Sequence, residues 1–368
     1  MVLSYVNITF RSFVHVSTAF CHATKERIDT EVLEQFYPCP ISPDVMISMA
    51  EKVEEGRLDN MTLIANWPNT YTFTKALAEE LIRVSAKDLP ICIVRPPIVY
   101  CGYREPAPGW LDPPIVIGPI ALSVGFYHLF FGSLNTRLAI VPVDMVNNAI
   151  IAAGWDAMQR RECKKEIPIY TVANKDNTFH WGQYTERVKM STPKAVWYCS
   201  QICCSNKHLA IVLSFFMHHV PAYILDFICD IIGKRPKGIK SFVGIYKLID
   251  KLGLIFSYFI VNEWGFKDDN TKQIMTRMTE DDKVIFNCDV SSIDFEEYYV
   301  MIILGVRKYL FKDDLKGTDV AVRRQKYFFR PLNYIVCALY IYVIYYILFS
   351  GYSIFRYFFN FLSDLSLN

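Results

Sequence analysis

Two apolar strand patterns separated by a helix pattern constrain the fold of this chain more than any other feature. Residues 13–17 and 91–95 are apolar enough for strands that are buried in a sheet. Between them, residues 71–87 carry good helix formers with apolar positions near helical spacing. A strand, a helix and a strand in this order predict two parallel strands joined by a right-handed crossover. The fold class is therefore α/β.

Later segments extend this prediction. Residues 167–173 can add a third strand, which takes the α/β region to about residue 190. Residues 96–118 gather glycines and prolines in a long loop, and such a loop inside a compact domain often carries function. From Gly238 onward the pattern is helical, so we expect a mostly helical second region.

The composition indicates contact with lipid. Hydrophobic residues make up 52% of the chain and the mean hydropathy is +0.18. The formal net charge of +2 is too small to draw nucleic acid, so we expect no nucleic-acid partner. No feature indicates an oligomeric state.

Residues 331–355 form a candidate transmembrane segment without a charged side chain. At about 1.5 Å per residue their helix is roughly 37 Å long, enough to cross a hydrocarbon core of about 30 Å. The alternative is a helix buried in the interface or against the protein. Four basic residues lie just before the segment and only Arg356 follows it, so the positive-inside rule keeps the large N-terminal part in the cytosol. The four are Arg323, Arg324, Lys326 and Arg330.

A second apolar stretch, residues 209–232, is interrupted by polar residues and a proline. These polar groups would be costly in lipid without partners, so we expect a helical hairpin or a membrane-surface patch rather than a second span. Eleven cysteines are too few for a disulfide scaffold. Cys199, Cys203 and Cys204 lack the paired spacing of a zinc site, so no metal is predicted.

The candidate chemistry begins with Tyr71 and Lys75, which lie on one face of the predicted helix. An ammonium near a phenol favours the phenolate and prepares the hydroxyl for proton transfer, as a carbonyl reductase requires. The hydroxyl pair Ser17 and Thr18 follows the first strand, and Arg95 ends the second. Open α/β sheets bind their ligands at the carboxyl ends of strands, so these groups should meet at one edge.

This order of parts resembles the extended short-chain dehydrogenase/reductases, and within them the alcohol-forming fatty acyl-CoA reductases of the insect type. The resemblance spans nearly the whole chain and implies a partial Rossmann domain over residues 1–195, a helical C-terminal domain over 205–315 and a transmembrane segment over 331–355. The implied fold is thus the C-terminal half of a doubly wound Rossmann sheet, then mostly helical. The motifs that carry the resemblance are residues 14–20, 69–76, 95–99, 109–112, 140–149, 262–266, 286–289, 293–298 and 305–310.

The resemblance also implies a reaction and its residues. Two NADPH in turn would reduce a long-chain acyl-CoA, first to an aldehyde and then to a primary alcohol. Tyr71 would protonate the carbonyl oxygen, Lys75 would hold the nicotinamide ribose, and Thr18 would hydrogen-bond the reacting carbonyl. The implied cofactor-binding residues are Ser17, Lys75, Arg95, Pro96, Pro97, Ile98 and Val99.

The sequence departs from the family pattern in one respect. It lacks the glycine-rich turn that holds the cofactor pyrophosphate in the family. Gly56 is the single glycine before Tyr71, so the sequence indicates an N-terminally truncated member. For such a chain we expect an inactive form that binds no NADPH measurably. We also expect a bare, aggregation-prone edge where missing strands belonged. The alternatives are a membrane-anchored interaction protein without catalysis, or an extended reductase acting on another lipid carbonyl. We expect a membrane protein of the endoplasmic reticulum with its reductase domain in the cytosol; the peroxisome is the alternative compartment.

Overall fold

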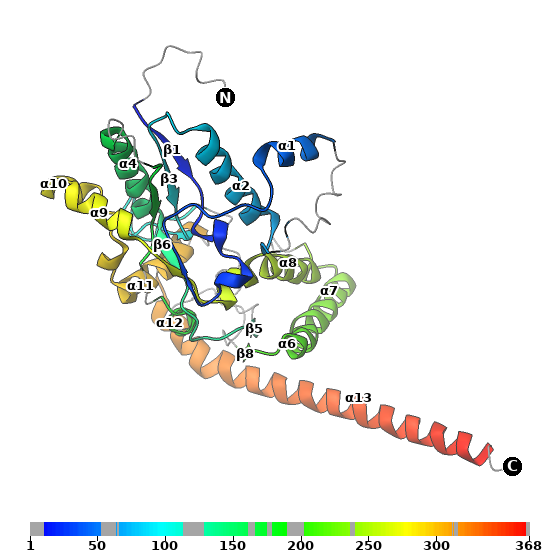
Figure 1. The fold of residues 1–368 in the computed structure, drawn as a ribbon. Coiled ribbons are helices and arrows are strands. Elements are labelled where there is room, and N and C mark those ends of the chain that lie inside the picture. The colour runs from blue at the N-terminus through cyan, green and yellow to red at the C-terminus, as the bar shows by residue number, and fades with distance from the viewer. Residues whose placement is uncertain are drawn as a thin grey trace.

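A three-stranded parallel sheet stands at the centre of the computed structural model (Figure 1). The structure describes residues 11–52, 64, 66–112, 129–160, 166–174, 179–189, 202–235, 240–310, 312 and 316–365. The strand order is β1 (Phe13–Val16), β3 (Ile91–Arg95) and β7 (Ile169–Thr171). Phe13 pairs with Ile91 and Ile93 with Ile169, in parallel register. The predicted parallel strands are therefore confirmed, with β7 shorter than the apolar run that indicated it.

Two helices cover opposite faces of this sheet. Because side chains alternate along a strand, Cys92 and Val94 of β3 point to one face and Arg95 to the other. Cys92 and Val94 pack in the core cluster that contains α4 (Val143–Gln159). Arg95 instead bonds to α2 (Thr70–Ser85), the helix that the sequence predicted between the first two strands. Figure 1 shows the two helices on either side of β1 and β3.

The remaining described strands form two-stranded parallel pairs. β2 (Glu31–Val32) pairs with β9 (Gly265–Phe266), β4 (Ile98–Tyr100) with β6 (Ile140–Pro142), and β5 (Leu129–Phe131) with β8 (Ile202–Cys204). The other helices of the described body are α1 (Pro43–Lys52), α5 (Trp181–Lys189), α9 (Asp269–Arg277), α10 (Glu280–Ile285), α11 (Phe295–Gly305) and α12 (Thr318–Arg324). The C-terminal region is thus mostly helical, as predicted.

The two regions expected to be separate domains share one hydrophobic core. Tyr298, Tyr299 and Ile302 of α11 are buried in the same cluster as the inner faces of β3 and α4. The loop after β4 docks directly on α11, where a Cβ placed on Gly305 would lie 1.9 Å from the carbonyl oxygen of Gly109. Only glycine permits this approach. The described part of the predicted functional loop therefore joins the two regions; residues 113–118 lie outside the described residues.

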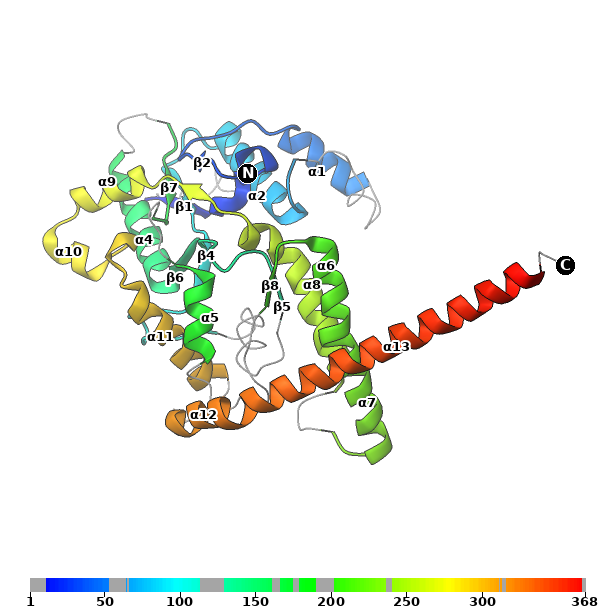
Figure 2. The same ribbon diagram turned by 90° about the horizontal axis from the view of Figure 1, so that it is seen from below.

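Three apolar helical segments extend outward from this core, of which α8 (Phe242–Val261) ends against it at Phe259 and Ile260. Residues Lys207–Ile232 form one unbroken helix made of α6 (Lys207–Ser214), a π-helical turn (Phe215–His219) and α7 (Val220–Ile232). It packs beside α8 (Phe242–Val261) (Figure 2). In the described part of the chain, this segment is long and apolar enough to cross a membrane. The stretch 209–232 is therefore not a hairpin in itself, although it pairs with the next helix.

The predicted transmembrane segment 331–355 lies within α13 (Arg330–Leu365). Figures 1 and 2 show α13 extending away from the body of the protein. Large apolar side chains such as Leu339 and Ile341 are exposed along its first part. Several of its side chains, including all those from residue 353, lie outside the described residues, so the span stays a prediction.

Candidate active site

The site forms where the carboxyl ends of β1 and β3 meet the first turns of α2. The chain leaves β1 at Val16, and the amide of Ser17 donates to the carbonyl oxygen of Val94 at 2.8 Å. The Lys75 ammonium donates to the carbonyl oxygen of Val16 at 2.9 Å. This bond brings Lys75, which lies four residues after Tyr71, to the strand end that is followed by Ser17 and Thr18. The sequence predicted that these groups lie at one edge of the sheet.

The first turn of α2 is fixed by a side-chain cap. Asn69 accepts a hydrogen bond from the amide of Thr72 at 3.0 Å, and the Thr72 hydroxyl bonds back to Asn69. Such a cap satisfies amides that have no partner within the helix. Tyr71 lies in this fixed turn and keeps 54% of its surface exposed, one turn before Lys75. The phenol is therefore accessible on a rigid support.

The two hydroxyl groups are placed differently. Thr18 is buried and caps the 3-10 helix Ala19–His22, accepting from the amide of Phe20 at 3.3 Å. Its hydroxyl also donates to the carbonyl oxygen of Pro96 at 3.3 Å. Ser17 is buried beside Cys21. Thr18 therefore joins the ends of β1 and β3, and its hydroxyl must leave Pro96 before it can donate to a substrate.

Arg95 forms a buried ion pair instead of facing an open site. Its guanidinium binds both carboxylate oxygens of Glu79, at 2.9 and 2.5 Å. It also donates to the carbonyl oxygens of Leu33 and Gln35 at 3.1 and 3.0 Å. Burial by itself would raise the pKa of Glu79, but the charge of Arg95 and the hydrogen bonds from His22 and Arg95 hold it well below its usual range. Arg95 thus fixes α2 against the sheet, and its guanidinium is engaged by protein partners.

Cys21, His22 and Glu79 bring three potential ligand atoms within 4.8 Å of one another. The sequence did not indicate this cluster, because Glu79 is 58 positions from Cys21. Arg95 already neutralises Glu79, and the Cys21 thiol donates to Glu79 at 3.2 Å. Burial raises the pKa of that thiol, which keeps it protonated. The arrangement is that of a buried charge cluster beneath α2.

The C-terminal region builds one wall of the site. The Phe20 ring contacts those of Phe259, Trp264 and Phe266 at centroid distances of 4.7, 6.3 and 5.2 Å. Parallel pairing of β2 with β9 holds this wall in place. Pro96 and Pro97 are buried at the end of β3, while Ile98 and Val99 are half-buried in β4. The predicted residues therefore lie in or next to the strand ends, although the guanidinium of Arg95 turns away into its ion pair with Glu79.

Two residues that hold the site were not singled out from the sequence. Asn69 caps α2, and Glu79 anchors it. For Glu79 the sequence offered a signal in its spacing, because Tyr71, Lys75 and Glu79 follow one another at four-residue intervals along one face of the helix. This face runs from the exposed phenol to the buried carboxylate.

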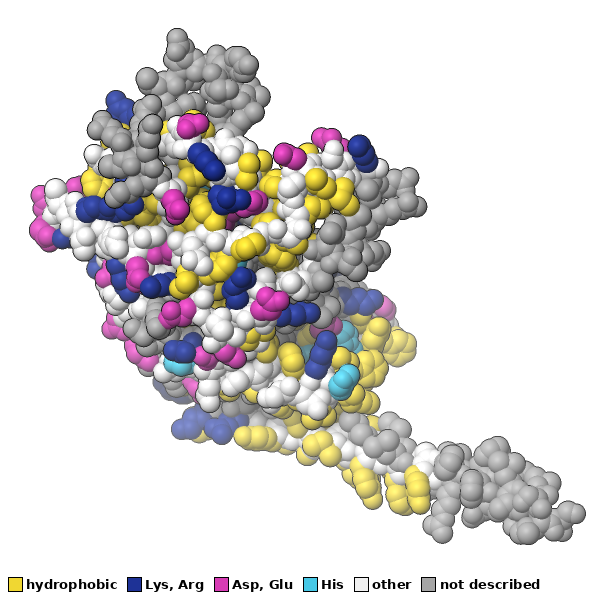
Figure 3. Space-filling view, in the orientation of Figure 1, with side chains coloured by type: hydrophobic (Ala, Val, Ile, Leu, Met, Phe, Trp, Pro, Cys, Tyr) yellow, Lys and Arg dark blue, Asp and Glu magenta, His cyan; other side chains and the backbone are white. Residues whose placement is uncertain are grey.

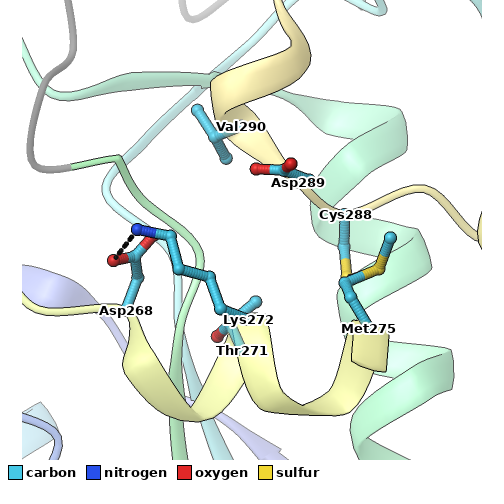
Figure 4. Close-up of a pocket in the computed structure, with 7 residues that line it drawn as sticks. All are labelled: Asp268, Thr271, Lys272, Met275, Cys288, Asp289 and Val290. Atoms are coloured by element: carbon cyan, nitrogen blue, oxygen red, sulfur yellow. Dashed lines mark hydrogen bonds and ion pairs between the residues drawn. The ribbon is translucent and has the colours of Figure 1, made fainter. Parts of the chain in front are cut away.

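The described cavities lie elsewhere. Figure 4 shows a cavity of about 230 Å³ between Lys272, Met275, Cys288 and Asp289, in which Lys272 is paired with Asp268 at 3.0 Å. Thr271, which also lines it, donates to Thr171 of β7, so the cavity lies at the sheet edge opposite β1. A second hollow of about 490 Å³ lies between the loop at Glu105 and the first turns of α4. Neither is lined by Tyr71 or Lys75.

Comparisons with known proteins agree with the arrangement of these parts. A family model described as male sterility protein matches residues 217–313, and an NAD-binding model of the same description matches residues 7–150. Fatty acyl-CoA reductase wat of Drosophila melanogaster is 33% identical over 329 residues, covering 86% of this chain and 61% of its own length. Fatty acyl-CoA reductase 2 of Homo sapiens is 30% identical over 326 residues, with the same coverage. The chain belongs to the fatty acyl-CoA reductase family.

The match to this family has a defined extent. The chain spans 61% of the length of these two reductases. The terminal R domain from the myxalamid PKS-NRPS biosynthetic pathway aligns with a TM-score of 0.47 at 14% identity, covering 83% of this chain and 60% of that domain.

Proposed function

We propose that this protein reduces a long-chain fatty acyl-CoA to a primary alcohol, using NADPH at the end of β1. The observation that carries the proposal is the bond from Lys75 to Val16, which places an ammonium at the strand end that leads into Ser17 and Thr18, one helical turn after the accessible Tyr71. A polar group of each kind that a carbonyl reductase needs is thus present at one strand end. Family membership supports an acyl-CoA as the substrate class.

The residues present fit a nicotinamide cofactor. Lys75 offers an ammonium at the strand end where doubly wound sheets bind dinucleotides, and it is only half-buried. Lys75 would hold the ribose, while Pro96, Pro97, Ile98 and Val99 would border the ring. When bound, the cofactor supplies hydride to the carbonyl carbon of the substrate.

The protein's own groups then manage the oxygen. Tyr71 donates its proton to the carbonyl oxygen as negative charge develops there, and Lys75 stabilises the phenolate that remains. Thr18 donates a hydrogen bond to the same oxygen after leaving Pro96. In the first reduction the resulting hemithioacetal loses CoA and leaves an aldehyde. The second reduction converts the aldehyde into the alcohol by the same proton transfer.

The membrane is part of the proposed function. An acyl chain dissolves in lipid, and the exposed apolar side chains of α13 would place the reductase region at the membrane surface. The four basic residues from Arg323 to Arg330 would hold that region in the cytosol. We propose the endoplasmic reticulum as the membrane.

The test is Tyr71→Phe, which removes the proton donor but keeps the ring. The full chain in lipid vesicles should form long-chain alcohol from palmitoyl-CoA and NADPH, and the variant should lose this by about 100-fold or more. Fluorescence titration with NADPH should not distinguish the variant from the wild type, because the substitution leaves the cofactor-binding groups in place.

Tyr327→Phe is the matched control, since Tyr327 is also exposed, at 70%, in a helical turn and lies away from the strand ends. Undiminished alcohol formation by Tyr71→Phe would exclude the catalytic assignment. A wild-type chain that forms no alcohol would favour the non-catalytic, membrane-anchored alternative.

A further inference from the structure

The outer face of α6 and α7 exposes a continuous apolar surface. Large side chains on it are among the most exposed of their kind in the described chain, with Phe227 at 67% and Ile231 at 70%. Figure 3 shows hydrophobic side chains gathered over α7 and the first part of α13. Other exposed members of this face are Leu209, Ile211, Val212, Phe215, Ile224, Ile228 and Ile232. Apolar patches of this extent mark a surface that meets lipid or another protein.

The imidazole groups of His218 and His219 in this helix lie toward α8 and away from the apolar face. His218 is buried, stacks on the ring of Tyr246 at 5.0 Å and bonds to the Ser214 hydroxyl at 3.2 Å. His219 bonds to Asp250 of α8 at 2.7 Å. The histidines that argued against lipid contact in the sequence therefore have protein partners.

The two carboxylates of α7 are satisfied in the same way. Asp226 accepts from the Ser241 hydroxyl and from the amides of Phe242 and Val243, at 2.7, 3.0 and 3.1 Å, and so caps α8. Arg235 pairs with Asp226 and, at 2.5 Å, with Asp230. Because a buried or lipid-facing charge is costly only without a partner, these carboxylates do not oppose membrane contact.

The ends of the helix indicate how it would meet a bilayer. Lys207 and His208 stand at its start and Lys234 follows its end, whereas Arg235 is paired with Asp226 and Asp230. Its first residue follows β8, which pairs with β5, and α8 leads back to Phe259 in the wall of the site. Both ends therefore return to the protein body, which fits a helix lying along one membrane surface and not a span. Basic residues at each end suit phosphate headgroups.

The surface is also continuous with α13. The Tyr340 hydroxyl of α13 donates to the carbonyl oxygen of Phe216, and Figure 2 shows α13 crossing this helix. A bilayer that receives α13 would therefore reach the apolar face of α6 and α7. If a second copy of the chain covered this face, we would expect a polar rim around an apolar centre, as in protein interfaces. This face is instead apolar between its basic ends.

We propose that residues 207–232 form a second membrane contact, lying in the interface of an anionic bilayer with the α8 side toward the protein. This rests on the membrane placement of α13 proposed above. It would fix the reductase body against the membrane, so that the end of β1 stays at a set distance from the lipid that holds the acyl chain.

Site-specific photocrosslinking tests the proposal on the full chain. A benzophenone amino acid replaces Phe227 or Ile231, and the protein is inserted into phosphatidylcholine vesicles that contain phosphatidylserine. Illumination should yield adducts between these positions and lipid. Val284 and Ile285 on α10 are equally exposed apolar controls, at 73% and 62%, and should give no lipid adduct.

The alternative results are separable. Covalent dimers formed from Phe227 or Ile231 would show that a second copy covers the face, and would overturn the proposal. A probe at Tyr342 in α13 reports the proposed anchor independently. Lipid adducts at Tyr342 but none at Phe227 and Ile231 would overturn the second contact alone, whereas none at any of the three would overturn both membrane proposals.

Discussion

Glu34 and Glu79 are two buried or half-buried carboxyl groups whose pKa values are shifted in opposite directions by their neighbours. Burial, together with the nearby Asp268 and Asp269, raises the pKa of Glu34 to about 7, although its carboxylate accepts the amides of Asn270 and Thr171 at 2.6 and 2.7 Å. Glu79 is more deeply buried, yet Arg95 and His22 keep its pKa low. A matched positive charge therefore outweighs burial at Glu79, and none does so at Glu34.

The raised pKa of Glu34 predicts a loss of stability as the pH rises. The folded protein binds a proton more tightly here than the unfolded chain, whose glutamate pKa is near 4.5. The free energy of unfolding should therefore fall by on the order of 1–3 kcal/mol between about pH 4.5 and pH 7 through this group. Urea unfolding of wild type and Glu34→Gln across this window measures the difference between the two proteins.

Comparing the two proteins cancels the contributions of His15 and His22 to the pH dependence of stability. Burial is the main cause of their lowered pKa values, so these two groups make the protein more stable as the pH rises. Glu26→Gln, at an exposed carboxylate, is the control. A difference between wild type and Glu34→Gln that does not change with pH would contradict the assignment.

Because Glu79 and Arg95 form a buried ion pair, replacing only one of them should strongly lower the free energy of unfolding. Glu79→Ala leaves the guanidinium of Arg95 buried without its carboxylate, which should cost about 3–5 kcal/mol of unfolding free energy. The double variant Glu79→Leu with Arg95→Met removes both charges and should lose clearly less. Chemical unfolding measures both, and equal losses would show that the ion pair itself does not determine the penalty.

At the scale of elements, β1 combines the candidate site with a sheet edge. Within the described residues it pairs with β3 on one side and with no strand on the other. Phe13 and Val16 are exposed on it, at 37% and 38%. An apolar parallel strand with an open edge can pair with another chain, so this element should govern self-association.

Phe13→Lys should reduce that association. A lysine on an edge strand opposes edge-to-edge pairing by charge repulsion and desolvation cost. Light scattering of the detergent-solubilised protein should show slower aggregation, with Val284→Lys on α10 as the control for general solubility. If both substitutions slow aggregation equally, the edge of β1 is not the cause.

For the whole molecule, the arrangement of apolar helices around the body leads to a topology prediction. α13 extends from the body, and the four basic residues from Arg323 to Arg330 lie at its body end. A glycosylation acceptor added after Asn368 should be modified in microsomes, and one placed before Arg323 should not. Modification at neither position, with release of the protein by carbonate, would show that α13 does not span.

Local patterns in the sequence predict which segments form elements and which polar groups gather at one strand end. Apolar runs, helical spacing and the YxxxK motif are local patterns, so β1, α2 and β3 could be predicted together with Tyr71 and Lys75. The family could be predicted as well, because its motifs are spread along the chain.

Which side chains meet depends on how elements that are distant in the sequence pack against one another. Arg95 sits at the predicted strand end, but its partner Glu79 and the carbonyl groups of residues 33 and 35 turn it into a buried anchor. Glu34 meets an amide 236 positions away, and the polar groups of α7 find partners on α8. A residue's type sets what it can bind, but burial and distant partners fix its charge and its role. Burial and distant partners arise only when separate elements pack together.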